Sequence, residues 1–298
     1  MPTLDAQTLS RLAGVKLRAR AVMEGVLSGL HKSPHQGQSV EFAEHKEYAP
    51  GDELRHLDWK AYGKLDKYYV KRFEHETNLR AVMVVDGSAS MGYRSAAADK
   101  GLSKLEVATT LAGALCYLLV RQQDAAGLAV VTGERVEDVP PRASAGHLST
   151  LLEAMERVEP KGTTDLFRAA DLLGEKLHRR SLVLVFSDLF DDRQDALRRI
   201  LQLRARKHDV AVFQILDPAE LEFPFDDPTL FLSMEDERRI EVNPREIKQS
   251  YLEELGQFLQ TTKALCAQND VEYELVRTDA PLDQVLLRFV ARRQGGRR

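Results

Sequence analysis

Strongly apolar runs alternate with amphipathic stretches from about residue 78 to the end of the chain. The apolar runs at 80–86, 126–131, 181–187, 209–216 and 271–277 have the length and composition of buried strands. Helical periodicity appears between them, near 101–122, 146–158, 165–178, 191–206 and 246–268, and again near 282–293. Strands that are apolar on both faces belong to parallel sheets covered by helices on both sides. The pattern therefore predicts an α/β fold with a doubly wound, mostly parallel sheet flanked by helices.

Two shorter extended pieces do not fit this alternation. Residues 135–139 follow the second strand closely enough to form an antiparallel edge strand. Residues 229–242 alternate between apolar and polar positions and predict a hairpin excursion within the region 219–245.

The N-terminal region has a different pattern. An amphipathic helix is predicted around residues 6–29, from the spacing of Leu9, Leu12, Val15, Val22, Val26 and Leu30. From 31 to 77, prolines and glycines interrupt the pattern and predict loops with short strands, such as the KYYVKRF run. We expect residues 1–77 to be a helix and an extension packed on the α/β domain of residues 78–298, because no flexible linker separates them.

Composition is that of a globular protein, with 43% apolar and 30% charged residues among 298. A net charge of -4 and a pI near 6.1 give no overall basic field for nucleic acid. Cys116 and Cys266 both lie in apolar helical stretches, which makes a disulfide framework improbable. The longest apolar run, 111–120, is too short to cross a bilayer, and no signal-peptide core is present at the N-terminus, so we expect a cytoplasmic protein.

The candidate chemistry lies where strands end. Asp86, Ser88 and Ser90 follow the first strand, Asp188 follows the third, and Thr164 lies in a glycine turn between them. Because ligands of doubly wound sheets bind at the carboxyl ends of the strands, these oxygens should converge. An all-oxygen set suits Mg²⁺ or Mn²⁺, whereas zinc would be expected to recruit His or Cys. Neutral hydroxyl ligands would leave the cation able to bind a carboxylate from outside.

These residues also carry a family resemblance. The D-x-S-x-S of Asp86, Ser88 and Ser90, the Thr164 turn and Asp188 resemble the metal-ion-dependent adhesion site of von Willebrand factor A domains. The resemblance implies a divalent cation that captures an acidic residue of a partner protein.

A second motif narrows the resemblance. The stretch G-D-x-x-R-x-[IL]-D-W is similar to the signature of the family called domain of unknown function fifty-eight, and it reads here as Gly51, Asp52, Arg55, Leu57, Asp58 and Trp59. The C-terminal FVARR run is similar too. That family resemblance implies partnership with a MoxR-type AAA+ ATPase, for which the chain would act as adaptor or co-chaperone. Unlike longer members, this sequence shows no N-terminal membrane helices, so a membrane anchor is not carried over.

Simpler interpretations exist for each motif. Asp86 and Ser88 could cap a turn, and Asp165 fits a helix cap better than a metal ligand. Asp191 and Asp192 are expected to form the cap and first turn of the following helix. Gly51, Asp52, Arg55, Asp58 and Trp59 could bind a partner or form a small buried scaffold. The spacings of His45, His56 and His75 match no zinc pattern, and the arginines of the C-terminal tail fit a solvated end.

Two enzymatic alternatives remain open. A serine hydrolase could use Ser88 or Ser90, but Ser88 stands where a nucleophile elbow needs glycine, and the late histidine, His208, precedes its strand. A metal-dependent phosphoryl-transfer enzyme would need a second acid and a phosphate-binding loop, and neither is evident. We therefore expect a binding module, not an enzyme.

Overall fold

The computed structural model describes residues 14–32, 45–47, 69–71, 79–95, 101–133, 135–191 and 195–295. The chain divides into two compact units, His31–Asn78 and the remainder. In the first of these, β1 (His45–Glu47) pairs antiparallel with β2 (Tyr69–Lys71), which lies within the predicted KYYVKRF strand. The signature residues Gly51, Asp52, Arg55, Asp58 and Trp59 lie outside the described residues.

The other unit contains a six-stranded sheet in the order β10-β7-β6-β3-β4-β5. All neighbouring strands are parallel except β5, which is antiparallel to β4 at one edge, as predicted. The strands are β3 (Arg80–Asp86), β4 (Ala125–Thr132), β5 (Arg135–Arg142), β6 (Leu182–Ser187), β7 (Asp209–Leu216) and β10 (Glu272–Arg277). The prediction of a doubly wound, mostly parallel α/β sheet is confirmed.

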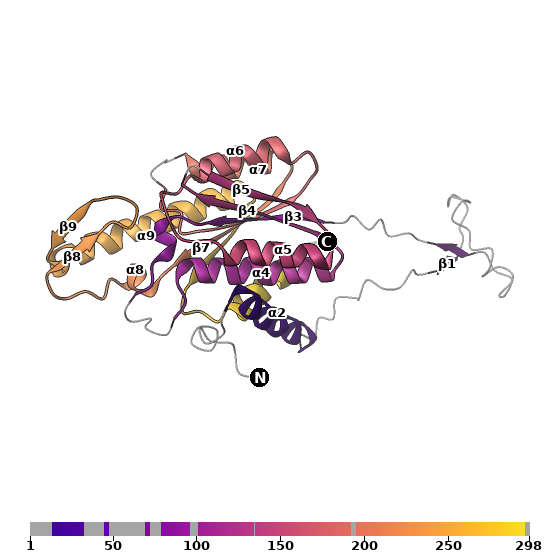
Figure 1. Cartoon of the computed structure of the whole chain (residues 1–298), viewed down its shortest axis with the longest axis horizontal. Helices are drawn as coiled ribbons and strands as arrows, with labels where there is room; N and C mark the ends of the chain where they lie inside the picture. The colour runs from indigo at the N-terminus through magenta and orange to yellow at the C-terminus, as the bar shows by residue number, and fades with distance from the viewer. Residues whose placement is uncertain are drawn as a thin grey trace. The chain divides into compact units, whose positions relative to one another are not determined.

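Helices cover both faces of this sheet (Figure 1). One face packs against α4 (Lys104–Arg121), α5 (Ala145–Glu156) and α10 (Leu282–Gly295), and α2 (Val15–Lys32) packs on these helices within the same core. The opposite face packs against α6 (Leu166–Lys176), α7 (Ala196–Ala205) and α9 (Pro244–Gln268). Alternate residues of β3 point to opposite faces, so Met83 and Val85 enter the first core while Val82 and Val84 enter the second.

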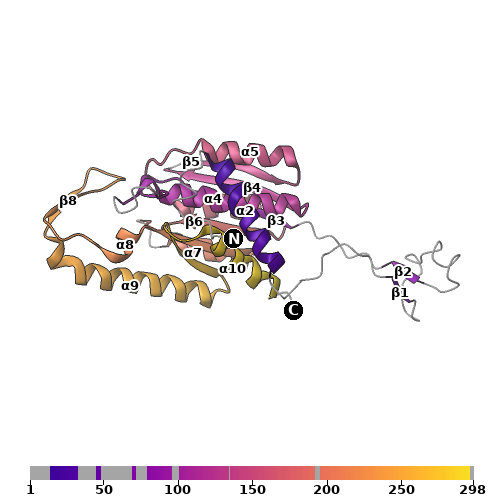
Figure 2. The same ribbon diagram turned by 90° about the horizontal axis from the view of Figure 1, so that it is seen from below.

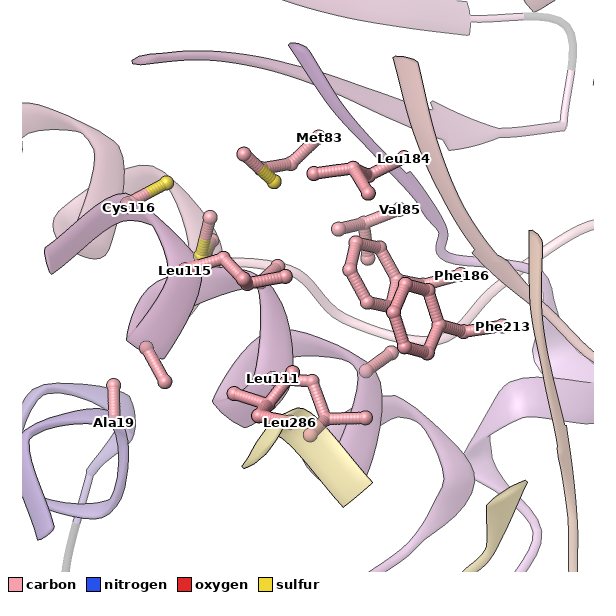
Figure 3. Packing of buried hydrophobic residues seen from close by; sticks show 14 of the residues in the cluster. Ala19, Met83, Val85, Leu111, Leu115, Cys116, Leu184, Phe186, Phe213 and Leu286 are labelled. Carbon is pink, nitrogen blue, oxygen red and sulfur yellow. The ribbon is translucent and has the colours of Figure 1, made fainter. Parts of the chain in front are cut away.

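The first core brings α4 against the middle of the sheet (Figure 3). Side chains from both layers point toward one another: Met83, Val85, Leu184, Phe186 and Phe213 from strands, and Leu111, Leu115 and Cys116 from α4. The rings of Phe186 and Phe213 stack with centroids 4.9 Å apart. This packing holds the ends of β3 and β6 in fixed relation, and the candidate site residues lie at those ends.

Helix α2 belongs to this core. Its buried residues, Val15, Ala19, Val22 and Val26, recur at helical spacing, and Ala19 meets α4 where Gly113 leaves room for it. Leu9 and Leu12, which the sequence analysis placed on the same face, lie outside the described residues. The prediction that the rest of 1–77 packs on the core stays a prediction.

The predicted hairpin excursion is present between β7 and α9. A short helix, α8 (Pro218–Glu222), precedes β8 (Thr229–Leu232) and β9 (Arg239–Val242), which pair antiparallel. Phe231 of β8 joins a cluster of aromatic rings with Phe223, Phe225 and Tyr251. In both orientations the hairpin extends beyond the end of the sheet (Figure 2).

One predicted boundary is wrong. The helix expected over 191–206 is α7, which begins at Ala196 with Asp195 as its N-cap residue. The Asp191 carboxylate instead accepts a hydrogen bond from the backbone N–H of Leu166, at the start of α6. Asp192 lies outside the described residues. The described part of the chain contains no helix with both the length and the apolar character that a membrane span requires.

Candidate metal site

The candidate site begins where β3 ends. Asp86 is fully buried, because β3 lies between β4 and β6 in the middle of the sheet. Its Oδ1 accepts a hydrogen bond of 2.9 Å from the backbone N–H of Ser88, which turns the chain away from the strand. A short 3₁₀ helix, Ala89–Gly92, follows and carries Ser90. The turn interpretation of Asp86 and Ser88 is therefore correct, and it is compatible with a ligand role.

This turn brings the two serine hydroxyls together. Ser88 Oγ and Ser90 Oγ are 3.0 Å apart, and Ser88 is fully buried. Adjacent ligands of an octahedral ion with bonds of about 2.1 Å are separated by about 3.0 Å. The separation of the hydroxyls thus fits two neighbouring positions around Mg²⁺.

The glycine turn before α6 delivers Thr164 to the same place. Gly162 has φ +71°, a conformation that favours glycine. Two backbone hydrogen bonds attach the turn to the loop after β3, from Ala89 N–H to the Gly162 carbonyl and from Lys161 N–H to the Gly87 carbonyl. Thr164 Oγ1 then donates to Asp86 Oδ2 over 3.3 Å. The predicted residues Asp86, Ser88, Ser90 and Thr164 therefore form one connected group.

Asp188 lies at the same edge, but other groups bind its carboxylate. Its Oδ1 accepts a hydrogen bond from the backbone N–H of Phe190. Its Oδ2 lies 2.8 Å from the Nζ of Lys104, which in turn lies 2.6 Å from Glu220 Oε1. Both Lys104 and Asp188 are almost completely buried. A buried ammonium therefore already compensates the charge of Asp188.

Sequence reasoning missed three residues of this neighbourhood. Ser187 is fully buried and its hydroxyl donates to Asp86 Oδ2 over 2.5 Å, while it accepts from the backbone N–H of Leu189. The polar residue at the end of an apolar strand could have indicated this role. The position of Lys104 could also have indicated a role. It lies in the first turn of α4, where the helix dipole disfavours a cation unless acids surround it. Glu220 gave no such indication.

The electrostatics of Asp86 follow from its surroundings. Burial, reinforced by the negative charge of Asp188, raises the pKa of Asp86 to about 7. Hydrogen bonds from Ser187 and Ser88 oppose this rise. Near neutral pH the ionised form of Asp86 is therefore costly, and a cation placed beside it would relieve that cost.

The donor set fits a hard cation better than a transition metal. Within the described residues, no group of three or more His, Cys, Asp and Glu side chains is arranged to hold a metal ion. The group at the sheet edge instead offers three hydroxyls and two carboxylates, and oxygen ligands are those that Mg²⁺ prefers. This mixture leaves room for ligands from outside the chain.

The serine hydrolase alternative loses its general base. His208 immediately precedes β7, whereas Ser88 follows β3, and both strands run parallel in one sheet. The two residues therefore lie at opposite ends of strands about 20 Å long. His208 is 3% exposed, and among the described residues its Nδ1 has no hydrogen-bond partner.

The remaining predicted residues separate clearly. Asp165 is the N-cap residue of α6 and accepts from the backbone N–H of Arg168, so its assignment as a cap is confirmed. Cys116 and Cys266 are buried and unpaired by any disulfide. His45 lies in β1, while His56 and His75 lie outside the described residues.

Comparison with known proteins identifies the family. The model of the family described as protein of unknown function DUF58 matches residues 44–257, most of the chain, and the chain therefore belongs to that family. Uncharacterized proteins of Mycobacterium tuberculosis and Mycobacterium bovis are 27% identical over 223 residues, covering 74% of this chain and 68% of theirs.

Solved structures with similarity to this chain include von Willebrand factor A domains. A von Willebrand factor type A protein from Catenulispora acidiphila is 15% identical, with a TM-score of 0.42 over 76% of this chain and 44% of that one. The SpRpn10 VWA domain is 12% identical, with a TM-score of 0.38 over 70% of this chain and 94% of that domain. The hypothetical protein BatB from Bacteroides thetaiotaomicron is 15% identical, with a TM-score of 0.46 over 72% of this chain and 98% of that one. Values of this size transfer no ligand or partner to this chain.

Proposed function

We propose that this DUF58 chain is a protein-interaction module that holds Mg²⁺, or Mn²⁺, at the carboxyl edge of its sheet and through it binds an acidic side chain of a partner. The hydroxyls of Ser88, Ser90 and Thr164 would be direct ligands. Asp86 would balance part of the charge of the ion, and Asp188, which is already paired with Lys104, would reach the ion through water. The chain itself would catalyse no reaction.

One observation carries the proposal. Oxygen atoms from two distant loops meet at Asp86: Thr164 Oγ1 donates to Asp86 Oδ2 over 3.3 Å, the backbone N–H of Ser88 donates to Asp86 Oδ1, and Ser88 Oγ lies 3.0 Å from Ser90 Oγ. Ser88 and Thr164 are buried, Ser90 is half-buried, and the ionised form of the nearby Asp86 carboxylate is costly; a small cation would stabilise such a group of oxygens.

The choice of an acidic partner follows from the number and charge of the donors. An octahedral ion has six positions, and three hydroxyls would leave the others to water and external ligands. Lys104 already neutralises Asp188, so the chain places little negative charge on the ion. An external carboxylate would supply the missing negative charge.

The partner's identity extends the same proposal. In line with the family resemblance, we assign the chain as an adaptor or co-chaperone of a MoxR-type AAA+ ATPase in the cytoplasm. The ATPase would supply the energy, and this chain would select what is bound. The signature residues from Gly51 to Trp59 are a second candidate contact with that ATPase.

The metal part is tested by thermal unfolding in EDTA and then with Mg²⁺ or Mn²⁺. A ligand at one hundred times its dissociation constant raises the free energy of unfolding by about 2.7 kcal/mol. The rise should be absent in Asp86→Asn and in Ser88→Ala, and present in the control Asp138→Asn, whose carboxylate pairs with Lys176 on the surface. A wild-type melting temperature that does not change when millimolar Mg²⁺ or Mn²⁺ is added would refute the metal site.

The partner part is tested by affinity capture with the wild type and Asp86→Asn, each in Mg²⁺ and in EDTA. A partner whose acidic side chain binds the metal should be captured by the wild type in Mg²⁺, and should be lost in EDTA and with Asp86→Asn. A MoxR-type ATPase should be among the proteins captured in Mg²⁺. Capture that persists in EDTA and with Asp86→Asn would show that the interaction uses another surface.

A further inference from the structure

An open hollow lies beside the candidate metal loop and is lined by positive charge. It has a volume of about 570 Å³. Its lining residues come from the end of β4, the start of β5, the turn before α6 and α6 itself: Thr132, Gly133, Arg135, Lys161, Gly162 and Arg168. Among the described lining residues three of six are cationic and none is acidic. The hollow therefore favours an anionic ligand.

The hollow and the candidate metal loop share a wall. Lys161 donates its backbone N–H to the carbonyl of Gly87 over 3.0 Å, and the carbonyl of Gly162 accepts from Ala89 N–H over 2.9 Å. A methyl group built on Gly87 would lie only 2.6 Å from Thr132 Cγ2. A ligand in the hollow would therefore lie next to the loop that carries Ser88 and Ser90.

The floor of the hollow is bare backbone. Gly133 and Gly162 have φ values of +54° and +71°, and a methyl group built on Gly162 would lie 3.2 Å from Gly133 Cα. Two glycines in this conformation, touching one another, allow a ligand to approach the main chain closely. A larger residue at Gly162 would be strained and would crowd this floor.

The three cations are available to a ligand. Arg135, Lys161 and Arg168 are all exposed, and within the described residues none of them forms an ion pair. By contrast, Lys176, on the same helix as Arg168, pairs with Asp138 of β5 at 2.8 Å. Nearby Asp165 uses its carboxylate to cap α6. Like charges gathered on one face raise the local positive potential.

We propose that this hollow binds acidic side chains of the partner. They would belong to the same peptide segment as the acid that binds the metal ion. This inference rests on the proposed function and specifies its ligand as an acidic peptide segment. Extended residues advance about 3.3 Å each, so acids a few positions apart in a partner would reach both the metal and the hollow. A volume of about 570 Å³ exceeds one carboxylate and accommodates several side chains.

The test uses a blocked tetraglutamate peptide as probe, with tetraglutamine as its uncharged match. Binding is followed by the backbone amide resonances of Gly133 and Gly162 in the full chain with Mg²⁺. Tetraglutamate should shift both resonances, and tetraglutamine should shift neither. The double variant Arg135→Gln/Arg168→Gln should weaken tetraglutamate binding about tenfold, because two charge-assisted contacts are lost.

The control removes the same charge elsewhere. Arg142→Gln/Arg179→Gln changes two exposed arginines outside the hollow and should bind tetraglutamate within about twofold of the wild type. Equal weakening in both double variants would overturn the proposal, since net charge alone would then explain binding. Pyrophosphate that binds more tightly than tetraglutamate and displaces it would also overturn it, in favour of a phosphate ligand.

The experiment separates this inference from the metal proposal. Arg135→Gln/Arg168→Gln should retain the full Mg²⁺-dependent rise in melting temperature, and Asp86→Asn should lose it. If Mg²⁺ stabilises the wild type but tetraglutamate binding does not depend on Arg135 and Arg168, the proposal for the hollow is refuted and the metal proposal stands. If tetraglutamate binding depends on these arginines but no metal binds, the hollow is an acidic-peptide site and the metal proposal fails.

Discussion

Lys104 and Asp188 form an ion pair inside the protein, with 2.8 Å between Nζ and Oδ2 and side chains that are 1% and 0% exposed. Glu220 of α8 lies 2.6 Å from the same ammonium. The pair links the start of α4, the end of β6 and the helix that leads into the hairpin. Acids on both sides raise the pKa of Lys104 even though burial lowers it, so the group stays charged.

Replacing Lys104 by Met should strongly destabilise the metal-free protein. The buried Asp188 and the partly buried Glu220 would lose their cation, and breaking one side of a buried pair typically costs about 3–5 kcal/mol. Chemical denaturation in EDTA measures this loss. The double variant Lys104→Met/Asp188→Asn should recover part of it, and a single variant as stable as the wild type would contradict the ion pair.

His208 should make stability depend on pH. Burial, together with the charge of Arg206, lowers the pKa of His208 below its usual 6.5. The folded state thus favours neutral His208, and its contribution is complete above pH 6.5 and is lost as pH falls through the lower folded-state value. The wild type should therefore exceed His208→Gln in free energy of unfolding at pH 7.5, and this excess should shrink as the pH is lowered to 5. A difference that stays constant with pH would show that His208 does not titrate differently in the two states.

Gly113 should tolerate no large side chain. A methyl group there would lie 2.9 Å from Ala19 Cβ and 3.0 Å from Leu152 Cδ2, so α2 and α5 both crowd this point of α4. Gly113→Leu should cost about 1–3 kcal/mol or more, because overpacking displaces α2. Denaturation measures the cost. The control Gly146→Leu places the same side chain at a helix position with open space around it and should be nearly neutral by comparison.

Gly162→Ala should weaken both candidate ligand sites. At φ +71° the alanine Cβ is strained by about 1–2 kcal/mol, and it would press on Gly133. The turn that positions Thr164 should shift, which lowers Mg²⁺ affinity and tetraglutamate binding together. Titrations of both ligands check this, with Gly256→Ala, in open space on α9, as control. Unchanged affinities would mean that the turn does not position either site.

The sheet could be predicted because its strands are unusually apolar. RAVMVVD and SLVLVFS are short, apolar and rich in valine, and this length and composition favour a strand over a helix. Both strands are buried at every central position. The edge strand was predicted over 135–139, and β5 continues through two prolines to Arg142. An edge strand needs no hydrogen bond from Pro140 or Pro141 on its open side.

The oxygen cluster could be predicted for a related reason. Asp86, Thr164 and Asp188 each follow a recognisable strand or turn, and parallel strands bring such ends together. Lys104 could not be found this way, because a lysine at the start of a helix normally lies in solvent. Its burial depends on α8, which the hydrophobic pattern did not reveal. Asp191 was misassigned because its partner, the N–H of Leu166, is distant in sequence.

The position of α2 has a consequence for synthesis. A methyl group built on Gly25 would lie 2.9 Å from Asp283 Cβ, and one on Gly29 would lie 2.7 Å from Leu287 Cδ2, so the first described helix closes onto α10 near the other end of the chain. A ribosome adding about 5–20 residues per second needs on the order of tens of seconds to reach α10. Throughout that interval the apolar stripe of α2 lacks the cover that α10 provides, so the contact between these two helices forms late in synthesis.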